Sequence, residues 1–192
     1  MSAVKAQLLV VDDDAALRES LGERLSTMGH RVRGAADGFS ALLAIRQEIP
    51  DVLICDLNMP RMSGFELLSV VRRRFPSIRV IAMSGVFEKD RIPEGVASDA
   101  FYEKGTSFGN LLLTIEALSD PGLATMDDNR EGVTPIWIEW NDSRDPQGAE
   151  VTINCPECFR TFRQVIKTES GVIEATSCVH CGGTIYYAIV PS

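Results

Sequence analysis

The features that this 192-residue sequence lacks limit its function first. It contains no stretch of about 18 uninterrupted apolar residues, the length a membrane helix needs, and residues 1–5 lack the apolar core of a signal peptide. Positive charge is scarce, with 19 Lys and Arg against 27 Asp and Glu, so the net charge of -8 disfavours binding of a polyanion through bulk electrostatics. We therefore expect a cytoplasmic protein with no membrane partner, and any nucleic-acid contact would need a local basic patch.

The composition and length indicate two folded parts. Hydrophobic residues make up 45% and charged residues 24% of the chain, close to ordinary globular usage, so most of the length can bury a core. From Ser119 to Thr134 the composition shifts to Asp, Pro, Gly and Asn, which is typical of a linker. We predict a first domain at residues 1–120, a linker at 121–134 and a small second domain at 135–192.

The first part has the pattern of an α/β protein. Short β-branched runs alternate with segments of helical spacing, as in βαβ units. The pattern predicts strands near 7–11, 31–36, 51–55, 79–83 and 100–103, and helices near 15–28, 39–48, 64–75 and 108–118. Between Ser84 and Ala100, Pro93 and two glycines predict a short or irregular element. We interpret the run from Arg72 to Arg74 as a solvated helix face.

Polar residues follow four of these strands: Asp12 and Asp13, Asp56, Ser84 and Lys104. Because ligands bind outside the carboxyl ends of parallel strands, these groups can converge on one site. Mg²⁺ prefers carboxylates, and a carboxylate can form an aspartyl-phosphate when the phosphoryl charge is neutralised. We expect Asp56 to be the nucleophile, Lys104 to be the cationic donor and the Ser84 hydroxyl to bind a phosphoryl oxygen.

Residues 6–118 resemble a response-regulator receiver domain of two-component signalling, a flavodoxin-like fold with a five-stranded parallel sheet. The resemblance rests on LVVDDD at 9–14, DVLICDLNMP at 51–60 followed by Ser63-Gly64, AMSG at 82–85 and FYEK at 101–104. It implies that Asp56 accepts a phosphoryl group from a sensor histidine kinase, with self-dephosphorylation but no independent substrate turnover. It also implies that Asp13, Asp56 and the backbone carbonyl of Asn58 coordinate Mg²⁺, with Asp12 acting mainly through coordinated water.

The same resemblance implies a conformational switch. On phosphorylation Ser84 would move toward the phosphoryl group and Phe101 would turn inward, which rearranges the face formed by the fourth helix, fifth strand and fifth helix. Output partners usually read that face, and a homodimer through it is left open. Gly105 stands where the family usually has a proline, so we expect the loop after the fifth strand to differ. A degenerate receiver that no longer accepts phosphate is the alternative.

Four of the five cysteines form two C-x-x-C pairs separated by 19 residues, Cys155 with Cys158 and Cys178 with Cys181. Each pair can present two thiolates to one tetrahedral ion, so the spacing favours a Cys₄ zinc site. Four thiolates close the coordination shell, which makes the zinc structural. With strand-type sequence near 136–140, 150–153, 159–166, 172–176 and 184–190, residues 135–192 resemble a zinc ribbon, a small all-β domain.

Three other residues of these types have simpler interpretations. Cys55 ends a buried run and is interpreted as a core residue. His180 is interpreted as a surface residue of its knuckle, and His30 as an ordinary loop residue.

The ribbon's charge favours protein interaction. Residues 126–192 contain ten Asp and Glu and five Arg and Lys, for a net charge of -5. Trp137, Trp140, Tyr186 and Tyr187 are candidates for either core or contact residues. A small patch for nucleic acid could still form from Arg160, Arg163 and Lys167 with Phe159 and Phe162.

We predict a cytoplasmic response regulator that is phosphorylated at Asp56 and signals to an unidentified protein partner, with the ribbon as output or docking module. A DNA-binding transcriptional regulator is the first alternative. A zinc or redox sensor, in which the ribbon receives the input, is the second.

Overall fold

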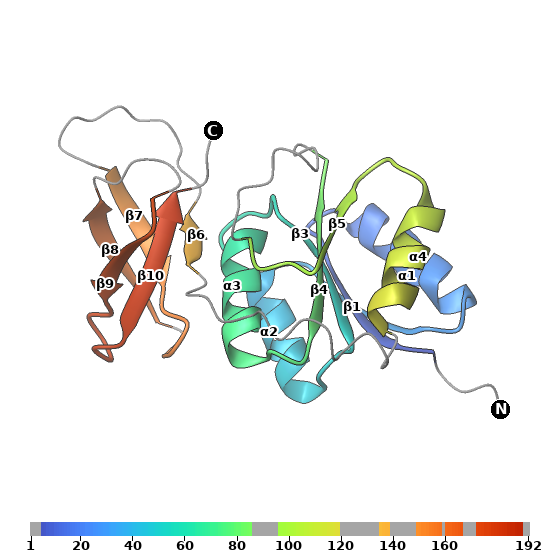
Figure 1. The fold of residues 1–192 in the computed structure, drawn as a ribbon, viewed down its shortest axis with the longest axis horizontal. Coiled ribbons are helices and arrows are strands. Elements are labelled where there is room, and N and C mark those ends of the chain that lie inside the picture. Colours follow the sequence, from blue (N-terminus) through green and yellow to red (C-terminus); the bar gives the residue numbers. More distant parts are fainter. Residues whose placement is uncertain are drawn as a thin grey trace.

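A computed structural model describes residues 5–85, 96–119, 135–138, 149–158, 160–166 and 172–189. The first part of the chain folds as a parallel sheet covered by helices on both faces (Figure 1). In chain order its elements are β1 (Gln7–Val11), α1 (Ala15–Thr27), β2 (Arg31–Ala35), α2 (Gly38–Gln47), β3 (Val52–Asp56), α3 (Gly64–Arg74), β4 (Arg79–Ser84), β5 (Ala100–Glu103) and α4 (Phe108–Ser119).

The strand order β2-β1-β3-β4-β5 confirms the predicted flavodoxin-like class. All four strand pairings are parallel, and the register places Val11 beside Cys55 and Asp56 beside Met83. Strands in such a sheet are buried on both faces, which explains their continuous apolar sequences. One core lies between the sheet and α1 and α4, and a second lies between the sheet and α2 and α3.

In its described residues the C-terminal unit, defined as β6 to β10, contains strands and turns but no helix, as predicted. It comprises β6 (Ile136–Ile138), β7 (Ala149–Asn154), β8 (Thr161–Ile166), β9 (Glu174–Ser177) and β10 (Thr184–Ile189). Strands β6, β10 and β9 form one sheet, and β7 and β8 form an antiparallel pair. Its core includes Ile153, Ile185 and Tyr187 together with Cys155 and Cys178.

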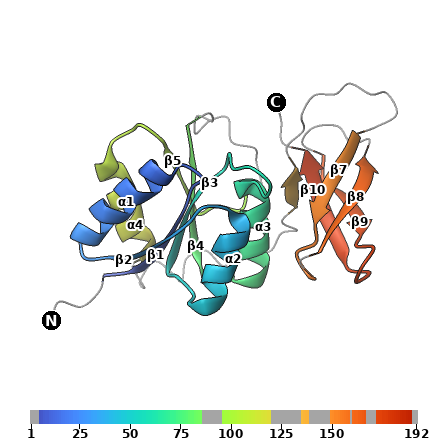
Figure 2. The same cartoon turned by 180° about the vertical axis from the view of Figure 1, so that it is seen from behind.

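Helix α3 is enclosed between the first sheet and the C-terminal unit. Both views place it beside β6 and β10 (Figures 1 and 2). Every residue from Gly64 to Val71 is buried, whereas a surface helix buries only one stripe. Trp137 is 3% exposed, and with Ala188 it belongs to the same hydrophobic cluster as the α2 and α3 core. The Ser69 hydroxyl donates a 2.7 Å hydrogen bond to the Pro135 carbonyl.

Two interpretations from the sequence are correct only in part. Arg73 and Arg74 are exposed, as in a solvated helix face, and form ion pairs with Glu157, whereas Arg72 is partly buried and its guanidinium lies 3.0 Å from the Asp99 carboxylate. His30 lies in the loop before β2, as predicted, but it is buried, with 6% of its surface exposed. The expected irregular element overlaps residues 86–95 and the linker lies within 120–134; both lie outside the described residues, so the domain boundaries stay a prediction.

The helices of the described residues are all too short or too polar to cross a bilayer.

Candidate functional site

Three carboxylates meet at the carboxyl ends of β1 and β3. The pairing of β1 with β3 brings Asp12 beside Asp56, and one oxygen from each of Asp12, Asp13 and Asp56 lies within 4.8 Å of the others. Asp12 is 0% and Asp56 is 3% exposed, while Asp13 faces solvent. The Lys104 ammonium, which follows β5, lies 2.9 Å from Asp12 Oδ2 and 2.7 Å from Asp56 Oδ2. The structure therefore brings these four predicted residues together.

Backbone and side-chain hydrogen bonds hold the cluster in place. The Asp14 N–H donates to Asp12 Oδ1 at 2.9 Å, while the Asp14 carboxylate caps the start of α1. The Asn58 N–H lies 3.3 Å from Asp56 Oδ1. The buried Ser84 hydroxyl donates to Asn58 Oδ1 at 3.1 Å, so Ser84 lies one side chain away from the cluster.

The charges of the cluster fit a divalent cation. Burial raises the pKa of Asp56, and its hydrogen bond and ion pair with Lys104 oppose this rise only in part. Burial also disfavours the charge of Lys104, but hydrogen bonds to Asp56 and Asp12 outweigh it and raise the pKa of Lys104. When ionised, the three carboxylates exceed the single ammonium by two negative charges. Oxygen donors with this charge suit Mg²⁺.

The start of α3 packs directly against the Asp56 backbone. The Gly64 N–H donates to the Leu57 carbonyl at 3.0 Å, and a Cβ on Gly64 would lie 2.0 Å from the Asp56 carbonyl oxygen. A capping box fixes the preceding turn, because the Ser63 hydroxyl accepts from the Glu66 N–H and Glu66 Oε2 accepts from the Ser63 N–H. This role of Glu66 was not predicted, although the S-x-x-E spacing is the sequence signal of a capping box.

The other two predicted positions lie at β5. Phe101 is half-buried and packs against the core on the α2 and α3 side. Gly105 has φ +89°, a conformation that a proline, fixed near -65°, cannot adopt. The loop after Lys104 therefore differs from a proline-containing loop, as expected, and the Thr106 N–H closes it on the Glu103 carbonyl at 3.2 Å.

The four paired cysteines form a second cluster. Their sulfurs lie within 4.8 Å of one another, with 3.7 Å between Cys155 and Cys181 and 3.7 Å between Cys158 and Cys178. Four sulfurs at about 2.3 Å from a tetrahedral zinc are about 3.8 Å apart, whereas a disulfide needs about 2.05 Å. The thiols are free, and their spacing fits a tetrahedral ion. His180 is exposed beside them, as predicted, and Cys55 is a buried core residue.

In the predicted basic and aromatic patch, the aromatic ring that the structure describes is not exposed. Phe162 is 8% exposed and belongs to the core of the C-terminal unit. Arg163 forms an exposed ion pair with Glu150 at 3.3 Å. Phe159 and Lys167 lie outside the described residues. A base therefore has no access to the face of Phe162.

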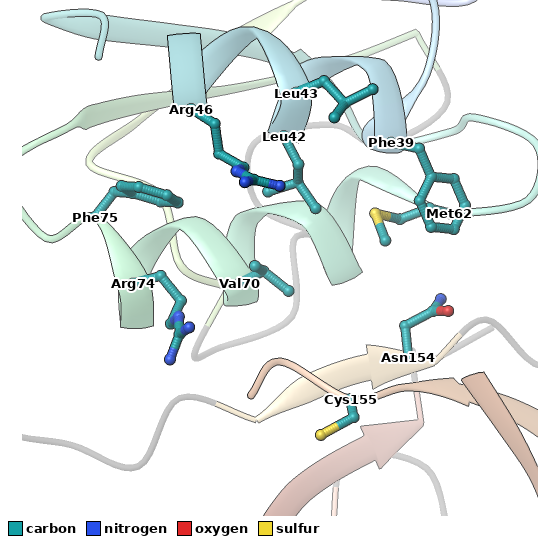
Figure 3. Close-up of a pocket in the computed structure, with 10 residues that line it drawn as sticks. All are labelled: Phe39, Leu42, Leu43, Arg46, Met62, Val70, Arg74, Phe75, Asn154 and Cys155. Atoms are coloured by element: carbon teal, nitrogen blue, oxygen red, sulfur yellow. The ribbon is translucent and has the colours of Figure 1, made fainter. Parts of the chain in front are cut away.

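A cavity of about 590 Å³ lies where α2, α3 and the C-terminal unit meet (Figure 3). Its walls are mostly apolar, and Arg46 extends from α2 across the gap toward α3. The Asn154 side chain points into the cavity from the C-terminal unit, and Cys155 lines the cavity beside it, with its sulfur directed away from the helices. The cysteine cluster thus adjoins the joint between the two parts of the chain. The remaining lining residues are Phe39, Leu42, Leu43, Met62, Val70, Arg74 and Phe75.

Comparison with known proteins adds an independent result. The family described as "Response regulator receiver domain" matches residues 8–107, just over half of the chain. Response regulator MprA of Mycobacterium ulcerans is 32% identical over 78% of this chain and 64% of its own length. Transcriptional regulatory protein ZraR of Klebsiella oxytoca is 35% identical over 65% of this chain and 29% of its own length. The chain therefore spans less than two thirds of these relatives.

Solved structures show the same similarity in the first part of the chain. The chemotaxis response regulator CheY4 of Vibrio cholerae aligns with a TM-score of 0.55 and 28% identity, covering 59% of this chain and 98% of that protein. Response regulator TrrA of Thermotoga maritima, solved in complex with Mg(2+)-BeF, also aligns with a TM-score of 0.55 and 28% identity. It covers 58% of this chain and 97% of that protein.

Proposed function

This chain belongs to the response regulator receiver domain family, and from that membership we propose that Asp56 accepts a phosphoryl group from a sensor histidine kinase. Receiver domains are phosphorylated by such kinases, and they bind Mg²⁺ through acidic residues. The observation that carries the proposal is the position of Asp56, which is buried at the end of β3, 2.7 Å from the Lys104 ammonium and clustered with the carboxylates of Asp12 and Asp13.

The transfer is a displacement at phosphorus. An Asp56 carboxylate oxygen forms the new O–P bond, the P–N bond to the donor imidazole breaks, and its electron pair stays on the imidazole nitrogen. Lys104, 2.7 Å from Asp56, stabilises negative charge on a phosphoryl oxygen. Mg²⁺ bound by Asp13, Asp56 and the Asn58 carbonyl, with Asp12 acting through water, would supply further charge neutralisation.

The response to phosphorylation begins at Ser84. Its hydroxyl donates to Asn58 Oδ1 in this structure, and a phosphoryl group on Asp56 offers it a charged acceptor instead. Movement of Ser84 leaves space into which Phe101 turns. Phe101 is half-buried rather than fixed in the core, which supports its role as the mobile partner.

The C-terminal unit is proposed to be a structural zinc ribbon that serves as an output or docking module for a protein partner. Sulfur spacings of 3.7 Å support the zinc, and the burial of Phe162 argues against stacking on nucleic acid. The names of relatives such as transcriptional regulatory protein ZraR favour DNA-binding regulation as the second candidate. Salt-dependent binding of the full chain to duplex DNA would support that candidate.

Phosphorylation can be tested with Mg²⁺ and a small phosphodonor such as acetyl phosphate. We expect one acid-labile phosphoryl group per chain, lost in Asp56→Asn and retained in Glu19→Gln, which removes an exposed carboxylate on α1. Labelling that persists in Asp56→Asn would overturn the assignment of the nucleophile. Absence of labelling in the unmodified chain would favour the degenerate receiver.

A further inference from the structure

We propose that the C-terminal unit positions the Asp56 loop through a buried hydrogen bond, with Glu66 as the positioning residue and Asn154 as its partner. This inference rests on the proposed function and extends it. It predicts that the state of Asp56 and the zinc affinity of the cysteine cluster depend on each other.

Glu66 connects the two parts of the chain with its two carboxylate oxygens. Oε2 accepts from the Ser63 N–H at 3.2 Å inside the capping box, and Oε1 accepts from the Asn154 side-chain amide at 3.0 Å. Both Glu66 and Asn154 are 7% exposed. Hydrogen bonds to a carboxylate away from water are strong, and losing one leaves a buried polar atom unsatisfied. The position of Asn154 is therefore coupled to the first turn of α3.

The first turn of α3 has no free space toward Asp56. The Gly64 N–H donates to the Leu57 carbonyl, and the Gly64 Cα is so close to the Asp56 carbonyl that no Cβ fits. A displacement of Ser63 and Gly64 must therefore displace the backbone that carries Asp56. Asn58, whose backbone contacts Asp56 Oδ1, follows in the same loop.

On its other side Asn154 adjoins the cysteine cluster. Cys155 is the next residue, and its sulfur lies 3.7 Å from that of Cys181. The turn between Cys155 and Cys158 also carries Glu157, whose carboxylate lies 2.9 Å from Arg73 and 3.1 Å from Arg74.

One short segment of the C-terminal unit thus contacts α3 at both ends. Asn154 reaches the first turn and Glu157 the last turn, while Ser69 donates to Pro135 between them. Every residue from Gly64 to Val71 is buried, so this part of α3 is a packed element and not a surface helix. Because Asn154 and Glu157 contact the two ends of α3, a shift of the helix changes the contacts of the segment that carries Cys155.

Reciprocal measurements on the full zinc-loaded chain test the coupling. Zinc affinity is measured by competition with a chromophoric chelator, with and without Mg²⁺ and beryllofluoride as the phosphoryl mimic. We expect the mimic to change the zinc affinity at least about fivefold, and zinc removal to change the apparent affinity for the mimic by the same factor. A purely structural hydrogen bond would leave both ratios at one.

Asn154→Leu should return the ratio to one, because it removes the amide that reaches Glu66. Thr176→Val is the matched control, since it removes a hydrogen bond to Gln164 inside the C-terminal unit and should retain the coupling. Should Asn154→Leu not fold, Glu66→Gln provides the second variant, because glutamine has an oxygen at only one of the two positions that accept these bonds and an NH₂ donor at the other. The ratio should then fall toward one.

The possible failures are distinguishable. If the unmodified chain is phosphorylated on Asp56 but its zinc affinity is unaffected by the mimic, the coupling is wrong and the proposed function stands. A coupling that survives in both Asn154→Leu and Glu66→Gln would also overturn the assigned route. If Asp56 accepts no phosphoryl group, the proposed function itself fails.

Discussion

Replacing Gly64 by alanine should both destabilise the protein and disturb the Asp56 loop. The added Cβ would lie 2.0 Å from the Asp56 carbonyl oxygen and 2.6 Å from the Leu57 Cα, and neither backbone atom can move away as a flexible side chain would. Overpacking of this kind costs about 1–3 kcal/mol. For a chain of this size each kcal/mol corresponds to roughly 2–4 °C, so we expect the melting temperature to fall by about 2–12 °C.

The matched control for Gly64→Ala is the same substitution at Gly22. A Cβ there meets nothing closer than Val32 Cγ1 at 4.0 Å, and Gly22 lies inside α1. Because glycine inside a helix costs about 0.5–1 kcal/mol relative to alanine, Gly22→Ala should raise the free energy of unfolding by that amount.

Thermal unfolding followed by far-UV circular dichroism, with excess zinc present, measures both variants. Phosphorylation by acetyl phosphate provides the second measurement, and it should be slower in Gly64→Ala only. A Gly64→Ala protein that melts at the unmodified temperature and is phosphorylated at the unmodified rate would refute the close packing.

Three further predictions concern other parts of the chain. Trp137→Ala should lower the free energy of unfolding, measured in urea, by about 3–5 kcal/mol. Leu113→Ala, at a side chain that is 66% exposed, should change it by less than about 0.5 kcal/mol. Equal effects of the two substitutions would contradict the enclosure of α3. Elemental analysis should find one zinc per chain, and this zinc should be lost in Cys178→Ser. Chelation of the metal should abolish the near-UV circular dichroism of the C-terminal unit. An unchanged spectrum without metal would argue against a structural ion. Burial lowers the pKa of His30, so below about pH 6.5 the unfolded chain binds more protons than the folded chain. The free energy of unfolding should therefore fall on acidification. If its slope against pH is the same in His30→Leu, His30 is excluded as the source.

The acidic cluster could be predicted from the sequence because it follows from a topological rule. Parallel strands end at one edge of the sheet, so Asp12, Asp56 and Lys104 needed only correct strand assignments to be placed together. The roles assigned to them stay predictions until phosphorylation is measured. Gly105 was also informative, since a glycine in place of proline indicated a different loop before its positive φ was known.

The enclosure of α3 was missed although its signal was present. The pattern predicted a helix near 64–75 but not its burial, and both Phe65, Leu68 and Val71 and, on the other side, Leu67 and Val70 are buried. In the segment GFELLSVV the apolar residues are not confined to one stripe, which indicates burial of more than one helix face, although Glu66 and Ser69 interrupt the pattern. What covered the second face was not visible in the local pattern.

The arginine pairs could not be found from local sequence. Arg74 pairs with Glu157, 83 positions away. Arg72 pairs with Asp99, which follows β4 in the sequence and directly precedes β5. Helical spacing rules describe partners three or four positions apart. The partners of these three arginines therefore become visible only once the tertiary fold is known.

The enclosure of α3 also has a consequence for biosynthesis. Ser69 and its partner Pro135 are 66 positions apart, so at about 5–20 residues per second the ribosome needs roughly 3–13 s to supply the covering strand after the helix is made. During that interval the face of α3 that carries Ser69 is open to water or to neighbouring chains. The nascent receiver is therefore exposed to aggregation and to chaperone capture until β6 emerges, and ribosomal pausing within residues 75–135 would lengthen that exposure.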